Sequence, residues 1–111
     1  MLDRVLEQQP GLYARAQYLT SASLRSMSQI LLVEAVAQLS GIAAVRNQEE
    51  GGFLATVDMA RFGRPPRTGE TLDVHARVVR SFGRLCMIEG QVLVGSEELL
   101  NVSLTLGIGP L

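Results

Sequence analysis

The pattern of apolar and polar positions along the chain predicts one long helix among several strands. In residues 26–49 the apolar side chains recur at helical spacing and cover more than one face of a helix. They are Ile30, Leu31, Val33, Ala37, Leu39, Ile42, Ala43 and Val45. A helix that is apolar nearly all round is normally buried, so we expect this helix at the centre of the fold. Ser26 and Ser28 are candidate N-caps, and the glycines at 51 and 52 are a candidate stop.

The rest of the chain alternates between apolar and polar residues, which is typical of half-buried strands. The stretches are 2–8 and 12–19 before the helix, then 53–60, 70–80, 84–94 and 98–108 after it. Turn signals at Gly83 and at Gly95 join the last three. Strands with one polar face predict an antiparallel sheet with one solvated side. We therefore expect an α+β fold, one domain over residues 1–111, in which this sheet wraps around one long central helix.

Composition narrows the possible functions. The net charge of −1 provides no general attraction to nucleic acid or to anionic membranes. All ten basic residues are arginine, so there is no lysine for a Schiff base or a phosphate loop. One cysteine, Cys86, and one histidine, His75, make a zinc site of the usual kind unexpected, and no cofactor motif is present. The N-terminus has no apolar signal-peptide region and the helical stretch contains Glu34, so we expect a cytoplasmic protein that does not enter the membrane.

Four segments make the sequence resemble the 3-hydroxyacyl-acyl-carrier-protein dehydratases. They are DRVLE at 3–7, LLVEAVAQLSGIAA at 31–44, FLATVDMARFGRPPRTGETL at 53–72 and VRSFGRLCMIEGQVLV at 79–94. The most specific part is EAVAQ, followed by the ARF-x-R-P and TGETL segments. The resemblance implies the hot-dog fold, an antiparallel sheet wrapped around a helix, and pairing of subunits as a dimer. The apolar strand at 53–59 is the edge that we expect to pair, because an exposed apolar edge invites another chain.

The chemistry that the resemblance implies is a histidine–carboxylate pair, with one member from each subunit. The carboxylate corresponds to Glu34, and Gln38 follows one turn later on the same helix face. The histidine of the family lies in a proline- and glycine-rich loop before the helix, but here its place holds Thr20 and the loop is absent. His75 falls on the predicted outward face of a later strand and does not replace it. Glu34 is the candidate catalytic residue, and Gln38 is a candidate substrate ligand; the alternatives are a structural glutamate and an interface glutamine.

Three arginines lie close together in the segment after the strand at 53–60. Arg61, Arg64 and Arg67 are candidate ligands for the acidic surface of a carrier protein or for a phosphopantetheine phosphate. The alternative is a solvated turn. The expected partner is thus an acyl thioester of acyl carrier protein or of coenzyme A.

Three functions remain open from the sequence. The first is an enzyme of the dehydratase type, a lyase, that is impaired alone because the histidine is absent and that works in a mixed dimer with a related subunit. The second is a non-catalytic acyl-binding protein or heteromeric partner subunit. The third is an acyl thioesterase, in which Glu34 alone activates water. The resemblance also implies a homodimer or a higher oligomer as the alternative to a mixed dimer.

Overall fold

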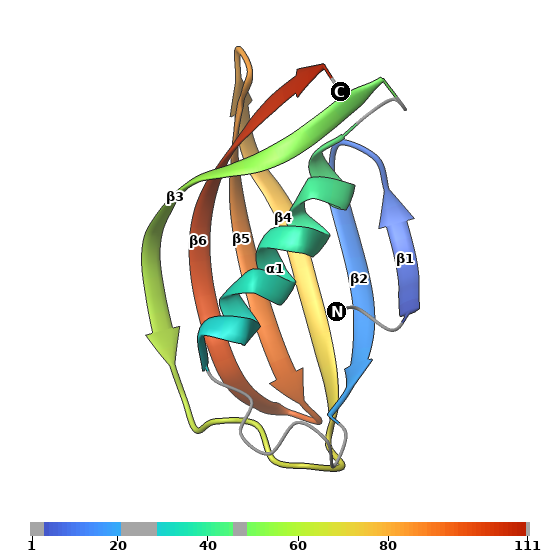
Figure 1. Cartoon of the computed structure of the whole chain (residues 1–111), viewed down its shortest axis with the longest axis vertical. Coiled ribbons are helices and arrows are strands. Elements are labelled where there is room, and N and C mark those ends of the chain that lie inside the picture. Colours follow the sequence, from blue (N-terminus) through green and yellow to red (C-terminus); the bar gives the residue numbers. More distant parts are fainter. Residues whose placement is uncertain (1–3, 21–28, 46–48, 111) are drawn as a thin grey trace.

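The computed structural model describes residues 4–20, 29–45 and 49–110, and these form one curved sheet with one helix against its concave face (Figure 1). The elements are β1 (Arg4–Gln9), β2 (Tyr13–Leu19), α1 (Gln29–Ala44), β3 (Glu50–Phe62), β4 (Thr71–Phe82), β5 (Leu85–Val94) and β6 (Glu97–Pro110). All neighbouring strands are antiparallel, in the order β1-β2-β4-β5-β6-β3. The expected α+β class, with a sheet wrapped around one helix, is confirmed.

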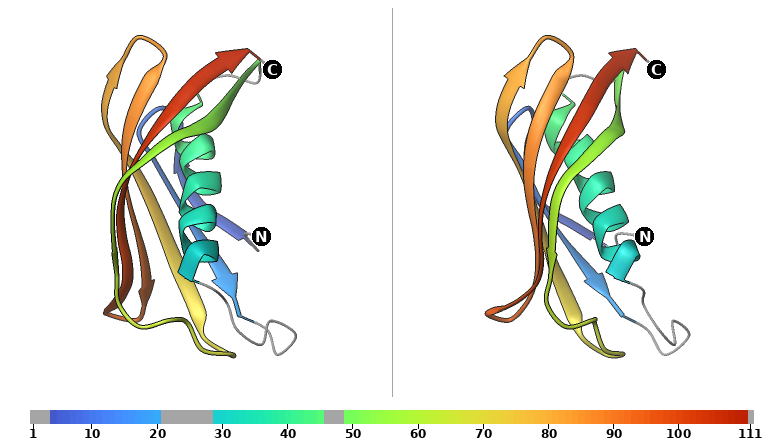
Figure 2. Two further views of the ribbon diagram at one scale, coloured as in Figure 1. Left: turned by 60° about the vertical axis from the view of Figure 1, so that its left-hand side comes forward. Right: turned by 90° about the vertical axis from the view of Figure 1, so that its left-hand side faces the viewer.

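The alternation of side chains along the strands decides which face of the sheet meets the helix. Alternate residues of β4, β5 and β6, most of them apolar, point inward and are buried over much of each strand, as predicted, while most residues between them are partly or fully exposed. The largest fully buried side chains of these strands are Leu72, Val74, Ile88, Val92, Leu99, Leu100, Val102, Leu104 and Leu106. Figure 2 shows the sheet bending around α1, so that one layer of side chains from each makes the core.

Glycines set the geometry at two hairpin turns and at one helix–strand crossing. Gly83 and Gly95, each with φ of 59°, occupy the hairpin turns between β4 and β5 and between β5 and β6, as predicted. Gly90 lies where α1 crosses β5. A Cβ atom at Gly90 would meet Cγ1 of Val36 at 2.2 Å, so the helix approaches the sheet there more closely than any side chain allows.

The helix ends earlier than predicted. It is described over Gln29–Ala44 and stops well before residue 49, and the candidate caps Ser26 and Ser28 lie outside the described residues. The glycines at 51 and 52, expected as a helix stop, belong to β3. Gly52 passes so close to the helix that a Cβ there would lie 3.2 Å from Cα of Gly41. Gly52 and Gly41 therefore allow β3 and α1 to touch, and the glycine pair at 51 and 52 does not serve as the helix stop.

Candidate functional site

Glu34 and Gln38 lie one turn apart on the exposed side of α1. The opposite side of the helix, with Leu32, Val36 and Leu39, is fully buried against the sheet. Both candidate side chains are exposed in the single chain, so the expectation of a helix buried on all sides is wrong. One six-stranded sheet covers only one face of the helix, and the apolar character of the other face has no counterpart within the described chain.

The neighbours of Glu34 on the helix are apolar. Leu31, Val33, Ala37 and Ile42 are half-buried, and pack against the rim of the core. The stripe formed by Leu31, Glu34, Gln38 and Ile42 thus combines two half-buried apolar side chains with two exposed polar ones.

Thr20, which the sequence resemblance predicts at the position of the family's histidine, is buried and engaged in several hydrogen bonds. Its hydroxyl donates to the carbonyl oxygen of Arg67 at 2.6 Å, and accepts from the backbone N–H of Glu70 at 2.9 Å. The backbone N–H of Thr20 donates to the Glu70 carbonyl at 3.0 Å. Thr20 therefore joins the end of β2 to the start of β4, and its hydroxyl has no free capacity for proton transfer to a ligand.

His75 lies on the outward face of β4, as predicted, and its partners are also there. Its Nδ1 is 3.0 Å from the hydroxyl of Tyr13, and its Nε2 is 3.4 Å from a carboxylate oxygen of Asp73. Arg15 donates two hydrogen bonds of 2.8 Å to Asp73, and this contact lowers the pKa of the Asp73 carboxyl. The sheet separates this cluster from α1, so His75 does not meet Glu34 within one chain. The pairing of Asp73 with Arg15, far apart in sequence, could not be predicted from the spacing of residues.

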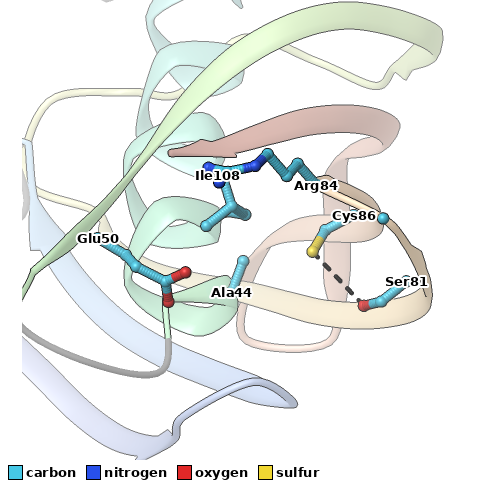
Figure 3. Close-up of a pocket in the computed structure, with 7 residues that line it drawn as sticks. Ala44, Glu50, Ser81, Arg84, Cys86 and Ile108 are labelled. Carbon is cyan, nitrogen blue, oxygen red and sulfur yellow. Dashed lines mark hydrogen bonds between the residues drawn. The ribbon is translucent and has the colours of Figure 1, made fainter. Parts of the chain in front are cut away.

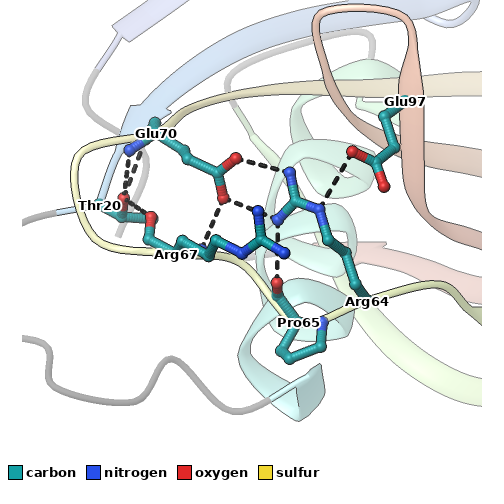
Figure 4. A network of polar contacts seen from close by, with 6 residues as sticks. All are labelled: Thr20, Arg64, Pro65, Arg67, Glu70 and Glu97. Atoms are coloured by element: carbon teal, nitrogen blue, oxygen red, sulfur yellow. Dashed lines mark hydrogen bonds and ion pairs between the residues drawn. The ribbon is translucent and has the colours of Figure 1, made fainter.

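The three candidate arginines differ in their surroundings, and Figure 4 shows two of them, Arg64 and Arg67. The guanidinium of Arg64 donates to both carboxylate oxygens of Glu70, at 2.9 and 2.6 Å, and to Glu97 at 3.0 Å. The side chains of Arg61 and Arg67 are exposed. Arg64 therefore holds the loop between β3 and β4, whereas Arg61 and Arg67 leave their charges accessible to a ligand.

Glu70 is the residue of this loop that sequence reasoning missed. It binds the side chain of Arg64 and accepts a hydrogen bond from the backbone N–H of Arg67 at 2.6 Å. These contacts, the Arg64 hydrogen bond first, lower the pKa of Glu70 to about 2. The loop is also tied to the helix, because the side-chain amide of Gln29 donates to the Gly63 carbonyl at 2.9 Å. The start of α1 and the arginine-bearing loop are thus held as one unit.

Two pockets lie away from Glu34 and Gln38. One, of about 340 Å³, is on the outward face and is lined by residues that include Tyr13, His75 and Gln91. The other, also of about 340 Å³, lies at the C-terminal end of α1 beside Ala44. Neither includes Glu34 or Gln38.

Among the described residues, no group of three or more His, Cys, Asp or Glu side chains could hold a metal ion. No helix in the described part of the chain has both the length and the apolar character needed to cross a membrane.

Solved structures with the same architecture identify the fold. Protein smu.793 from Streptococcus mutans, bound to acetyl CoA, has a TM-score of 0.83 at 11% identity, over 96% of this chain and 88% of its own. A hypothetical thioesterase with coenzyme A from Streptococcus pneumoniae has a TM-score of 0.83 at 9% identity, over 96% and 85%. The dehydratase heterocomplex ApeI:P from Xenorhabdus doucetiae has a TM-score of 0.74 at 18% identity, over 96% and 80%. The chain has the hot-dog fold.

Within this fold, the sequence resembles the 3-hydroxyacyl-acyl-carrier-protein dehydratases, as predicted. FabZ of Agrobacterium fabrum is 44% identical over 62 residues, which cover 53% of this chain and 40% of the relative. FabZ of Bacillus subtilis is 30% identical over 86 residues, 75% of this chain and 61% of the relative. The chain thus spans less than two thirds of either protein. FabZ of Nitratidesulfovibrio vulgaris is 27% identical over 123 positions, 97% of this chain and 80% of the relative. No protein-family model matches the chain.

Proposed function

We propose that this chain is an acyl-thioester-binding hot-dog subunit that contributes Glu34 to a site completed by a second hot-dog subunit. The observation that carries the proposal is the position of Glu34, exposed on the outer side of α1 among half-buried apolar side chains. A second subunit that covers this side of the helix would enclose the carboxylate. Enclosure in an apolar site raises the pKa of a carboxyl group, which suits it to take up and release a proton near neutral pH.

Dehydration of a 3-hydroxyacyl thioester needs one group to take the α-proton and another to protonate the leaving hydroxyl. Glu34 supplies one of them. The only histidine of the chain lies on the other face of the sheet, and Thr20 is committed to the backbone of the loop. The second group would therefore come from the other subunit of a mixed dimer. That the hot-dog fold admits such pairing is supported by the dehydratase heterocomplex of Xenorhabdus doucetiae.

The substrate of this site would be an acyl chain carried by acyl carrier protein or by coenzyme A, in the cytoplasm. Gln38, one turn from Glu34, would bind the thioester carbonyl. Arg61 and Arg67 would bind the phosphate groups of the carrier, since guanidinium groups form strong charge-assisted hydrogen bonds to phosphate. Arg64 would act indirectly, by holding the loop that bears Arg67 and follows directly after Arg61 at the end of β3.

A second candidate function is hydrolysis of the thioester. The observation that favours it is the same exposed carboxylate without a histidine, because a carboxylate alone can activate a water molecule for attack on the thioester carbonyl. A hypothetical thioesterase is among the proteins with this fold. In this case a homodimer would suffice, with Glu34 of each subunit enclosed by the other.

Assays of the purified protein distinguish these functions. We expect little dehydration of 3-hydroxyacyl thioesters by the protein alone, and an enoyl product when a histidine-bearing hot-dog subunit is added. Glu34→Gln should lower the rate of the mixture by about 10²–10⁴-fold. The melting temperature should change little, because Glu34 is exposed. Glu89→Gln, an exposed glutamate on the outward face, is the matched control.

Two results would contradict the proposal. Dehydration by the protein alone at roughly 1–10³ per second would show that no second subunit is needed. An unchanged rate in the Glu34→Gln mixture would remove Glu34 from the chemistry. Release of free thiol by the protein alone, lost in Glu34→Gln, would establish the thioesterase instead.

A further inference from the structure

The cavity at the C-terminal end of α1 is built by elements that extend beyond the helix. The helix ends at Ala44, whereas the hairpin of β4 and β5 extends beyond this point, as Figure 2 shows. The inward face of the hairpin there has no helix over it. The first residue of β3, Glu50, and Ile108 of β6 close the other sides, which leaves a cavity of about 340 Å³. This volume lies at the lower end of the range of small-molecule sites, about 300–1,000 Å³.

The lining of the cavity has an apolar floor and a polar mouth (Figure 3). Ala44 and Ile108 are almost fully buried, and so is the thiol-bearing Cys86, whose Sγ is 3.5 Å from the hydroxyl of Ser81. Arg84, in the hairpin turn, lines the cavity beside them. A ligand of this cavity would therefore place an apolar body on the floor and a polar group at the hairpin turn.

The charges at the mouth select the sign of that polar group. Within residues 4–20, 29–45 and 49–110, the guanidinium of Arg84 has no ion-pair partner. Glu50 lies on another side of the cavity and is engaged in an interaction of its own. Among the described residues that line the cavity, Arg84 is thus the cation without an ion-pair partner, and an anion would bind it on the side away from Glu50.

We propose that this cavity is a second ligand site, which binds a small anionic amphiphile such as the carboxylate of a short fatty acid. The carboxylate would accept hydrogen bonds from Arg84 and from the hydroxyl of Ser81, and the apolar chain would lie against Ala44 and Ile108. The site is distinct from the one proposed around Glu34. Ten helical residues separate Glu34 from Ala44, which corresponds to about 15 Å along the helix axis.

Titration of the intact protein with octanoate tests this site. We expect octanoate to bind with one site per chain, and to shift the amide NMR signals of Ala44, Cys86 and Ile108. Arg84→Gln should weaken binding by about tenfold or more, because a charge-assisted hydrogen bond is lost. The matched control is Arg80→Gln, in the same hairpin, whose guanidinium lies over the ring of Phe82 instead. Ser81→Leu, which fills the cavity from an exposed strand position, should also weaken binding.

Several results would overturn the proposal of a second ligand site. Equal binding of octanoate to Arg84→Gln, or of the neutral octanamide to the original protein, would show that no anion is recognised. Shifts centred on Glu34 rather than on Ala44 would place the ligand in the other site. An absence of octanoate binding at millimolar concentration would also refute the second site.

Discussion

Glu70 illustrates at the residue scale how one carboxylate organises an end of the molecule. It holds Arg64 by two hydrogen bonds and the backbone of Arg67 by a third. Because Arg64 also contacts Glu97 at the β5–β6 turn, two separate connections of the chain meet at these side chains. Of the two arginines proposed to bind the carrier phosphates, Arg67 extends from the loop that this network holds, and Arg61 lies just before it at the end of β3.

The shifted pKa of Glu70 makes its contribution to stability dependent on pH. The folded-state pKa is about 2, below the ordinary value of 4.5, so ionised Glu70 stabilises the fold above pH 4.5 and this stabilisation is lost as the pH falls toward 2. We expect Glu70→Gln to lower the melting temperature at pH 7. The difference from the original protein should shrink below about pH 4.5 and vanish near pH 2, as thermal melts across this range would show.

A matched substitution controls for the loss of any carboxylate near Arg64. Glu97→Gln removes an exposed partner that makes a single contact with the same guanidinium, and exposed pairs contribute little. It should change the melting temperature less than Glu70→Gln. A difference for Glu70→Gln that stays constant from pH 7 to pH 2 would show that shape, and not charge, accounts for the effect.

At the scale of elements, the contact between α1 and β5 fixes the position of the helix. Because Gly90 has no side chain, Val36 fits directly against the strand. We expect Gly90→Ala to destabilise the protein by about 1–3 kcal/mol, since the helix must move or a side chain must leave its preferred rotamer. Urea unfolding followed by circular dichroism measures the change.

The same substitution at Gly41 should have the opposite sign. A Cβ at Gly41 meets no atom within 4 Å, and alanine favours a helix over glycine by up to about 1 kcal/mol. Gly41→Ala should therefore stabilise the protein slightly. If both alanines had equal effects, the close approach at Gly90 would not be what positions the helix.

The elements also show which parts of the structure the sequence could predict. Strand faces followed from alternation, because a period of two allows only two faces and one is apolar. The end of the helix did not, because the glycine at 52 serves contact with Gly41 and not termination. The exposure of Glu34 was also not predicted. The composition of the helix indicates apolar residues on more than one face, but it does not indicate that a single sheet covers only one of these faces. The ion pairs of Arg64 could not be predicted either, because Glu70 and Glu97 come close to this residue only in the folded chain.

At the scale of the whole molecule, the outer side of α1 and the free edge of β3 are not covered by any described part of the chain. Strand β3 pairs with β6 on one side and ends the sheet on the other. Val57 and Met59 on this strand are 45% and 59% exposed. We propose that two subunits join their sheets through β3, which would bring a second helix beside the first.

Light scattering at micromolar concentration tests this assembly. We expect a dimer for the original protein and a monomer for the double variant Val57→Lys, Met59→Lys, because charges on an apolar edge oppose pairing. Val79→Lys is the matched control, since this valine is 52% exposed on the β4–β5 hairpin and away from β3. A monomer without any substitution, or a dimer that survives both lysines, would contradict pairing through β3.

The two edges of the sheet are unequal, and this limits how far such pairing can proceed. β1, the opposite edge, has six residues against thirteen in β3. The carboxylate of Glu7 also contacts Arg15 of β2 at 3.3 Å. A short and charged edge is a poor template for another strand. Joining at β3 alone produces a closed pair, whereas two equally receptive edges would let subunits add without end and form fibres.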